Sequence, residues 1–342
     1  MCVMKLFSFF IYGLAFFFLF EANQTMGLEA ELQILSVHTQ AVEVVKFSPD
    51  GKYLVSAGED NRAILWNLKS GKIARVLSGH FDQGVKCIDI SSDGTLLACG
   101  NGDGTLRIWN VNTGKCTQTI KAHTESVFAL AFTSDKSKII SGGHDGKIFI
   151  WNVENGQMLL SIKPPETTTS ISSTLNGKIT FSSQIHSGLY CLALSPDGRT
   201  VATGGYSESI KIWDSSTGKL ILAFKGNKYR VNSLEFSPDG TKLVGSGEDS
   251  LVKIWDAKTG KELIECKGHK TGILSVVFSP KGDRIMSGSK DRTIKIWSSQ
   301  NGELLHTLQN EKNYVNSVSF SPDGKSIACT NGNIVKLWRL SE

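Results

Sequence analysis

Residues 64–67 read ILWN, and the same pattern returns along the chain as RIWN, FIWN, KIWD, KIWD, KIWS and KLWR. One tryptophan stands at the same place in each copy: Trp66, Trp109, Trp151, Trp213, Trp255, Trp297 and Trp338. Successive tryptophans are 43, 42, 62, 42, 42 and 41 residues apart. A period of about 40–45 residues is typical of a unit with four short strands, which cannot bury both of its faces alone. The period therefore predicts similar units that stack against one another.

Other sequence motifs recur with the same period as the tryptophans. A polar residue lies 27–29 positions upstream of each one: His38, His80, His123, His186, Asn227, His269 and Asn310. An SPDG turn begins at Ser48, Ser195, Ser237 and Ser321, and a TGK turn begins at Thr113, Thr217 and Thr259. In these residues the chain resembles the WD-repeat (G-protein β-like) family over residues 30–340. The resemblance implies an all-β fold, a seven-bladed β-propeller of four-stranded antiparallel blades.

The two ends of the chain predict how the ring closes. In the first repeat, alternating apolar residues indicate strands over 42–47, 53–57, 63–67 and 73–77. The last repeat ends four residues after Trp338 and therefore lacks a fourth strand. Residues 32–38 parallel residues 74–80, so we expect the N-terminal strand to complete the last blade and cover its open edge.

Residues 1–25 form a separate apolar segment ahead of a single propeller that spans residues 26–342. The run Leu6–Phe20 resembles the hydrophobic region of a signal peptide and is shorter than a membrane-spanning helix. Three interpretations remain open: a secretory signal, a membrane anchor, or a true start at Met26. The seven cysteines are an odd number without C-x-x-C spacing, which favours reduced thiols and no metal site. We therefore expect a cytoplasmic or nuclear protein, with a secretory or membrane-anchored form through residues 6–20 as the alternative.

Each blade contains residues that could be mistaken for a catalytic triad. In the WD-repeat family a His, a Ser or Thr, an Asp and the Trp form a hydrogen-bonded chain, which satisfies their buried polar groups. Because the set recurs, we interpret it as structural. It is complete in three blades: His38, Ser56, Asp60 and Trp66; His123, Ser141, Asp145 and Trp151; His269, Ser287, Asp291 and Trp297. Four blades depart from it through Cys99, Ser207, Asn227 with Gly245, and Asn310 with Ala328 and Gly332. Blades four, five and seven are therefore expected to be locally weaker.

The resemblance also implies a binding face, formed by the turns between the second and third strands and by the connections between blades. Contact positions on that face are aromatic or basic in blades three to five, a composition typical of interface hot spots. The candidate partner-binding residues are Phe128, His144, Tyr190, Tyr206, Tyr229, Arg230 and Glu248.

An insertion separates Trp151 from Trp213. It lies at about residues 163–185 and holds Asn176-Gly177 between two apolar-rich runs, a strong signal for a β-hairpin. We expect the hairpin on the side of the connection between blades, next to the aromatic positions. It is either a tolerated surface insertion or a wall specific to a partner.

These features favour a monomeric, non-catalytic scaffold that assembles or regulates a protein complex by binding other proteins or peptide segments. No cofactor, metal site or small-molecule substrate is expected. The net charge of +5 is spread over turns, which disfavours direct nucleic-acid binding, and membrane contact would require residues 1–25. The alternative function is that of a chromatin- or RNA-associated WD protein that recognises a basic peptide tail through Glu43, Glu59 and Glu248. A propeller hydrolase is disfavoured, because no unrepeated catalytic set stands out.

Overall fold

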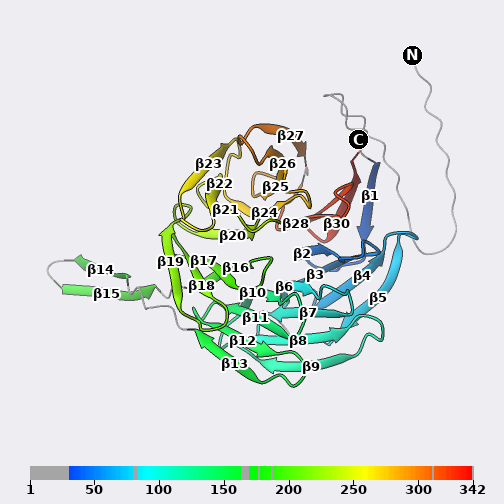
Figure 1. The fold of residues 1–342 in the computed structure, drawn as a ribbon, viewed down its shortest axis with the longest axis horizontal. Coiled ribbons are helices and arrows are strands. Elements are labelled where there is room, and N and C mark those ends of the chain that lie inside the picture. The colour runs from blue at the N-terminus through cyan, green and yellow to red at the C-terminus, as the bar shows by residue number, and fades with distance from the viewer. Residues whose placement is uncertain are drawn as a thin grey trace, which may run out of the picture.

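The computed structural model describes residues 31–79, 83–162, 169–175, 178–185, 188–309 and 312–340. Seven four-stranded antiparallel sheets are arranged as blades around a central axis, and a two-stranded sheet stands apart from them (Figure 1). The predicted seven-bladed propeller is therefore confirmed. The described residues contain no helix that is long and apolar enough to cross a bilayer.

Each blade begins with its strand nearest the axis and runs outward, as the view down the ring shows (Figure 1). The strands of blades one to four are β2 (Val42–Phe47), β3 (Tyr53–Gly58), β4 (Arg62–Asn67) and β5 (Lys72–Ser78); β6 (Val85–Ile90), β7 (Leu96–Asn101), β8 (Thr105–Asn110) and β9 (Cys116–Lys121); β10 (Val127–Phe132), β11 (Lys138–Gly143), β12 (Ile148–Asn152) and β13 (Met158–Ile162); β16 (Leu189–Leu194), β17 (Thr200–Gly205), β18 (Ser209–Asp214) and β19 (Leu220–Lys225).

The strands of blades five to seven are β20 (Val231–Phe236), β21 (Lys242–Gly247), β22 (Leu251–Asp256) and β23 (Glu262–Lys267); β24 (Ile273–Phe278), β25 (Arg284–Ser289), β26 (Thr293–Ser298) and β27 (Leu304–Gln309); β28 (Val318–Phe320), β29 (Ser326–Asn331), β30 (Ile334–Arg339) and β1 (Glu31–Ser36).

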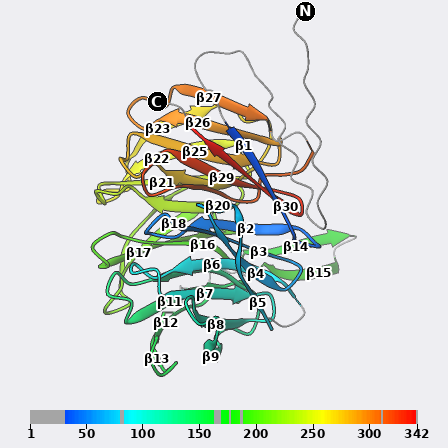
Figure 2. The ribbon, with the colours of Figure 1, turned by 90° about the vertical axis from the view of Figure 1, so that its right-hand side faces the viewer.

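The ring closes because the N-terminal strand β1 pairs with a strand from the C-terminal end in the last blade. Strand β1 pairs antiparallel with β30, from Glu31 opposite Arg339 to Ser36 opposite Ile334. The two strands lie side by side in both views (Figures 1 and 2). Leu35 is buried in the apolar core between blades seven and one, so β1 contributes packing as well as hydrogen bonds. The predicted closure is confirmed.

The SPDG turns are fixed by their own side chains. In the first one the Ser48 hydroxyl donates to Asp50 at 2.6 Å and accepts the N–H of Tyr53 at 2.9 Å. Gly51 adopts φ 68°, a left-handed conformation that costs glycine little. Because the same residues recur, the turn holds the two inner strands of its blade in register.

The innermost strand of a blade is an edge, and in blades one, three, six and seven side chains of the preceding blade accept hydrogen bonds from its N–H groups. The Val45 and Phe47 amides donate to Ser317 at 3.2 Å and Ser319 at 3.3 Å, across the closing seam. The Phe132 amide donates to Asp89 at 2.7 Å, and the Phe278 amide donates to the Glu235 carboxylate. These bonds join neighbouring blades where an uncapped edge would leave polar groups unpaired.

The hydrophobic cores lie between blades, each built from two neighbours. The cysteines contribute to this packing: Cys87, Cys99, Cys191, Cys266 and Cys329 are buried, and Cys116 is exposed. Burial raises the pKa of the Cys266 thiol to about 12, so this side chain stays protonated at neutral pH. Cys2 and the apolar segment at residues 1–25 lie outside the described residues.

The insertion between blades three and four forms the predicted hairpin. Strand β14 (Thr169–Leu175) pairs antiparallel with β15 (Lys178–Ile185), from Thr169 opposite Ile185 to Leu175 opposite Lys178. The Asn-Gly pair at 176–177 lies outside the described residues. The hairpin projects outward from the ring beyond β13 and β19 (Figure 1).

Candidate functional site

A β-bulge at the start of the innermost strand turns one side chain per blade toward the mouth of the channel. The register shifts at this place in six blades, for example between Val127 and Ala129 and between Leu189 and Cys191. Bulges often re-aim side chains beside functional sites. The residues at the turned position line a hollow of about 410 Å³: Glu43, Lys86, Phe128, Tyr190, Asn232, Leu274 and Asn316.

In blade seven the residue that faces the hollow, Asn316, is positioned by a side-chain contact. Its innermost strand β28 is short because the Thr330 hydroxyl takes the N–H groups of Asn316 at 2.8 Å and Ser317 at 3.1 Å. Asn316 still faces the hollow and donates toward the Glu43 carboxylate at 3.3 Å, across the seam to blade one.

Four aromatic side chains from blades three and four form one cluster at this mouth. The rings of Phe128 and Tyr190 are stacked, with centroids 4.8 Å apart and an interplanar angle of 23°. Tyr206 meets Tyr190 edge-on at 5.0 Å, and its hydroxyl accepts a 3.0 Å hydrogen bond from the Tyr190 hydroxyl. His144 lies 5.7 Å from both Phe128 and Tyr190 in edge-to-face geometry. The sequence placed these residues on neighbouring blades, and the structure brings their rings into mutual contact.

Arg230 of blade five extends this aromatic cluster. Its guanidinium carbon lies 4.3 Å from the centroid of the Tyr190 ring, within cation–π range. The Arg230 Nε donates to Asn232 at 2.6 Å, and its Nη2 donates to Glu248 at 2.6 Å. Lys290 of blade six holds the same carboxylate through two contacts of 2.9 Å. Glu248 thus orients Arg230 and connects blades five and six.

The electrostatics of the cluster follow from these contacts. Burial raises the pKa of Tyr190 to about 12, and its hydrogen bond to Tyr206 adds to that shift. Burial alone would raise the pKa of Glu248, but the hydrogen bonds from Lys290 and Asn232 lower it overall. At neutral pH the site therefore presents a neutral phenol beside a permanently charged guanidinium.

Tyr229 stands apart from the ring cluster. It is 69% exposed, and no ring contact within the described residues joins it to the four aromatics. Its backbone has φ 70°, and the Arg230 amide donates to the Lys228 carbonyl at 3.0 Å, which closes a tight γ-turn. A non-glycine residue in this conformation is strained, and such strain concentrates at functional sites.

The opposite side of the hollow carries carboxylates. The Lys86 ammonium lies 3.7 Å from Glu43 and 4.0 Å from Glu59, so one cation forms ion pairs with two carboxylates. Burial raises the pKa of Glu43, with the neighbouring Lys86 opposing that shift. The hollow is therefore acidic toward blade one and aromatic with basic neighbours toward blades three to six.

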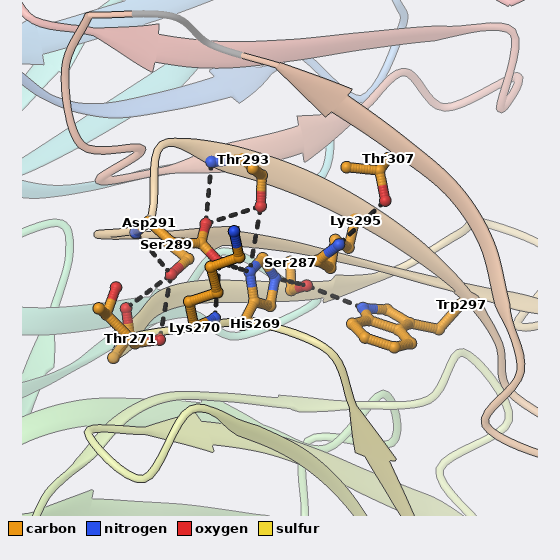
Figure 3. A network of polar contacts seen from close by, with 11 residues as sticks. His269, Lys270, Thr271, Ser287, Ser289, Asp291, Thr293, Lys295, Trp297 and Thr307 are labelled. Atoms are coloured by element: carbon orange, nitrogen blue, oxygen red, sulfur yellow. Dashed lines mark hydrogen bonds and ion pairs between the residues drawn. The ribbon is translucent and has the colours of Figure 1, made fainter. Parts of the chain in front are cut away.

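The predicted polar tetrads are hydrogen-bonded chains. In blade six the Trp297 indole donates to Ser287 at 2.8 Å, and Ser287 lies 2.8 Å from His269 Nε2. The other imidazole nitrogen lies 2.8 Å from Asp291 (Figure 3). Burial lowers the pKa of His269, which keeps the imidazole neutral. Every ring nitrogen is then satisfied, so this set performs a structural role.

The same bonds recur in blades one and three. The Trp66 indole donates to Ser56 at 2.8 Å, and the Trp151 indole donates to Ser141 at 2.9 Å. His38 and His123 connect those hydroxyls, each at 2.8 Å, to the carboxylates of Asp60 and Asp145, each at 2.9 Å.

The blades with an incomplete tetrad show which hydrogen bonds are lost when one of its four residues differs. In blade four Thr203 still accepts the Trp213 indole at 2.8 Å. In blade five Asn227 binds Asp249 at 2.9 Å, but Gly245 offers no hydroxyl, and no hydrogen bond within the described residues satisfies the Trp255 Nε1. A Cβ on Gly245 would lie 2.8 Å from that indole, so the ring occupies the space a serine would need. His80, His186 and Asn310 lie outside the described residues.

The family model described as "WD domain, G-beta repeat" matches residues 29–67, 71–110, 114–152, 177–214, 218–256, 260–298 and 302–339. This chain belongs to the WD-repeat family. WD-repeat propellers commonly serve as platforms for protein interaction.

Two curated relatives are similar to short parts of this WD-repeat chain. A WD repeat-containing protein of Schizosaccharomyces pombe is 38% identical over 55 residues, 16% of this chain and 18% of that protein. Protein HIR1 of Kluyveromyces lactis is 48% identical over 40 residues, 12% of this chain and 5% of that protein. The chain thus aligns with less than a fifth of either relative, and the similarity supports the repeat rather than a particular client.

Further charges lie in the innermost strands of this WD-repeat propeller, and they were not predicted from the sequence. Lys46 contacts Asp89 at 2.5 Å, and Glu235 is packed against the next blade. Burial raises the pKa of Glu235 to about 7. Their shared place in the innermost strand, one residue before its end, could have revealed them. Two of these side chains cap neighbouring blades, which assigns them to ring assembly.

A larger hollow of about 710 Å³ lies on the seam between blades seven and one. It is lined by turn residues such as Pro49, Asp50, Pro322 and Asp323, together with Arg339. These turns repeat around the ring, and the hollow gathers no aromatic cluster. We therefore place the candidate site at the channel mouth. Among the described residues, no group of three or more His, Cys, Asp or Glu side chains could hold a metal ion.

Proposed function

We propose that this protein is a non-catalytic scaffold that assembles or regulates a protein complex by binding a peptide segment of another protein. The segment docks at the channel mouth over blades three to five. The observation that carries the proposal is the contiguous contact of Phe128, His144, Tyr190 and Tyr206 with Arg230. Aromatic and arginine side chains dominate interface hot spots, because they bury large areas with few rotatable bonds.

The preorganisation of the cluster supports this role. Tyr190 is stacked on one side by Phe128 and covered by Arg230, while Tyr206 remains 42% exposed. His144 is held by Glu125, whose carboxylate lies 2.5 Å from its Nδ1. A partner would therefore meet side chains that are already ordered and would lose little further side-chain entropy on binding.

The alternative role, recognition of a basic tail, is less well supported. It depends on Glu43, Glu59 and Glu248 as open anions. The Glu248 carboxylate is engaged by Arg230 and Lys290, and Lys86 lies between the other two. A basic segment would have to displace these internal cations before it could pair with the carboxylates.

The test is an affinity capture from native cells with the chain started at Met26. The bound proteins are compared between the parent and the Phe128→Ala/Tyr190→Ala/Arg230→Ala variant. We expect partners to be lost from this variant, because hot-spot truncations typically cost more than about 2 kcal/mol each.

A matched control is Tyr314→Ala/Arg199→Ala. Tyr314 is 54% exposed outside the cluster, and Arg199 lies in a turn of blade four. Both variants are first checked for the parent's thermal melting curve. An unchanged partner set in a folded cluster variant contradicts the proposal and moves the interface to another face.

A further inference from the structure

Three glutamates beside the candidate site in blades three to five are already paired within the chain. Glu248 is shared by Arg230 and Lys290, and Glu125 binds His144. Glu208 lies 3.8 Å from Lys225 and accepts the Tyr229 amide at 3.3 Å. These carboxylates therefore have little remaining capacity for a basic partner.

Basic groups in the same sector remain available. Lys228 and Lys270 are exposed, and in the part of the chain that the structure describes neither ammonium takes part in an ion pair. They occupy equivalent places in neighbouring blades, because their amides donate to Asp249 at 2.7 Å and to Asp291 at 2.9 Å.

The strained turn joins these charges to the aromatic cluster. Lys228, Tyr229 and Arg230 follow one another in the γ-turn, and the Tyr229 side chain is exposed. The acidic side of the hollow, at Glu43 and Glu59, lies toward blade one. The unpaired charge is thus basic next to the aromatic cluster.

We propose that the site recognises an acidic peptide segment with an apolar anchor residue. The anchor enters the hollow of about 410 Å³ against Phe128, Tyr190 and Leu274. The flanking carboxylates of the segment meet Lys228 and Lys270, beside the Arg230 guanidinium. This inference rests on the proposed function and adds the chemistry of the partner to it.

The experiment is a synthetic peptide array probed with the purified full-length chain. Each peptide has about twelve residues, the scale of an extended recognition segment. A central Phe, Trp or Leu is flanked on both sides by Glu, by Gln or by Lys. We expect Glu-flanked peptides to be retained about tenfold more than Lys-flanked ones, and retention to fall between about 0.05 and 0.5 M salt.

Charge reversal supplies the matched variants. Lys228→Glu/Lys270→Glu should abolish the preference for Glu-flanked peptides. Lys115→Glu/Lys219→Glu makes the same change in net charge at two exposed turns and should leave the preference intact. Failure to retain any Glu-flanked peptide, or an equal effect of the two double reversals, overturns the inference.

The aromatic variant separates this inference from the proposed function. If Phe128→Ala/Tyr190→Ala removes retention but charge has no influence, the docking site stands and the acidic partner is wrong. If retention survives both the aromatic and the charge variants, the docking site itself is wrong.

Discussion

Ser287 offers a test of the tetrads, because one hydroxyl satisfies two buried groups. It accepts the Trp297 indole at 2.8 Å and bonds His269 Nε2 at 2.8 Å, and it is fully buried. Ser287→Ala removes both bonds and leaves the two ring nitrogens unpaired. Each unsatisfied buried group costs about 1–3 kcal/mol, so for two groups we expect a loss of about 2–6 kcal/mol in the free energy of unfolding.

Ser246 in blade five is a matched control. It is also a fully buried strand serine, but within the described residues its hydroxyl has no hydrogen-bond partner. Ser246→Ala removes an unpaired polar atom, so we expect a change between about 0 and 1 kcal/mol toward greater stability.

The assay is urea denaturation of both variants, followed by tryptophan fluorescence and by circular dichroism. Coincident transitions from the two probes justify a free-energy comparison. Equal midpoints for Ser287→Ala and Ser246→Ala would refute the argument that the hydrogen-bonded chain stabilises its blade.

Three further predictions follow from the ring. Deletion of residues 30–37 removes β1, exposes the edge of β30, and should lower the melting temperature by more than a surface truncation does; a melt that matches the parent would contradict closure. In hydrogen exchange, the amides of blade five should exchange faster than those of blade six, because Trp255 lacks the hydroxyl partner that Trp297 has; uniform protection would oppose this. The folded-state pKa of Glu235 is raised from 4.5 to about 7, so the folded chain binds more protons in that interval and stability falls as pH rises through it. Glu235→Gln should therefore be more stable than the parent at pH 8, by about 1–3 kcal/mol, and an unchanged pH profile of urea midpoints would refute it.

The fold could be predicted because its signals are local and repeated. The tryptophan period predicts the repeating unit, and the SPDG turns recur with it. The missing last strand predicts that β1 pairs with β30. Strand ends differed by one residue, as in Tyr53–Gly58 and Lys72–Ser78, because hydrogen bonding continues into the turn.

The candidate site was predicted only as positions on neighbouring blades. The stacking of Phe128 on Tyr190, and the position of Arg230 over the same ring, depend on rotamers and on the bulge, which a sequence does not specify. Tyr229 was grouped with them by adjacency alone, whereas it is 69% exposed and no ring contact within the described residues joins it to the cluster. The sequence did not predict that Asp89 and Glu235 accept hydrogen bonds from the next blade, because each bond joins residues 43 positions apart.

We propose that the channel mouth over blades three to five is the binding surface. Its most direct test is hydrogen–deuterium exchange of the chain, alone and in complex with the captured partner. We predict new protection in residues 123–130, 188–194 and 227–234, with the SPDG and TGK turns unchanged. Protection confined to those turns or to the outer strands would contradict the claim.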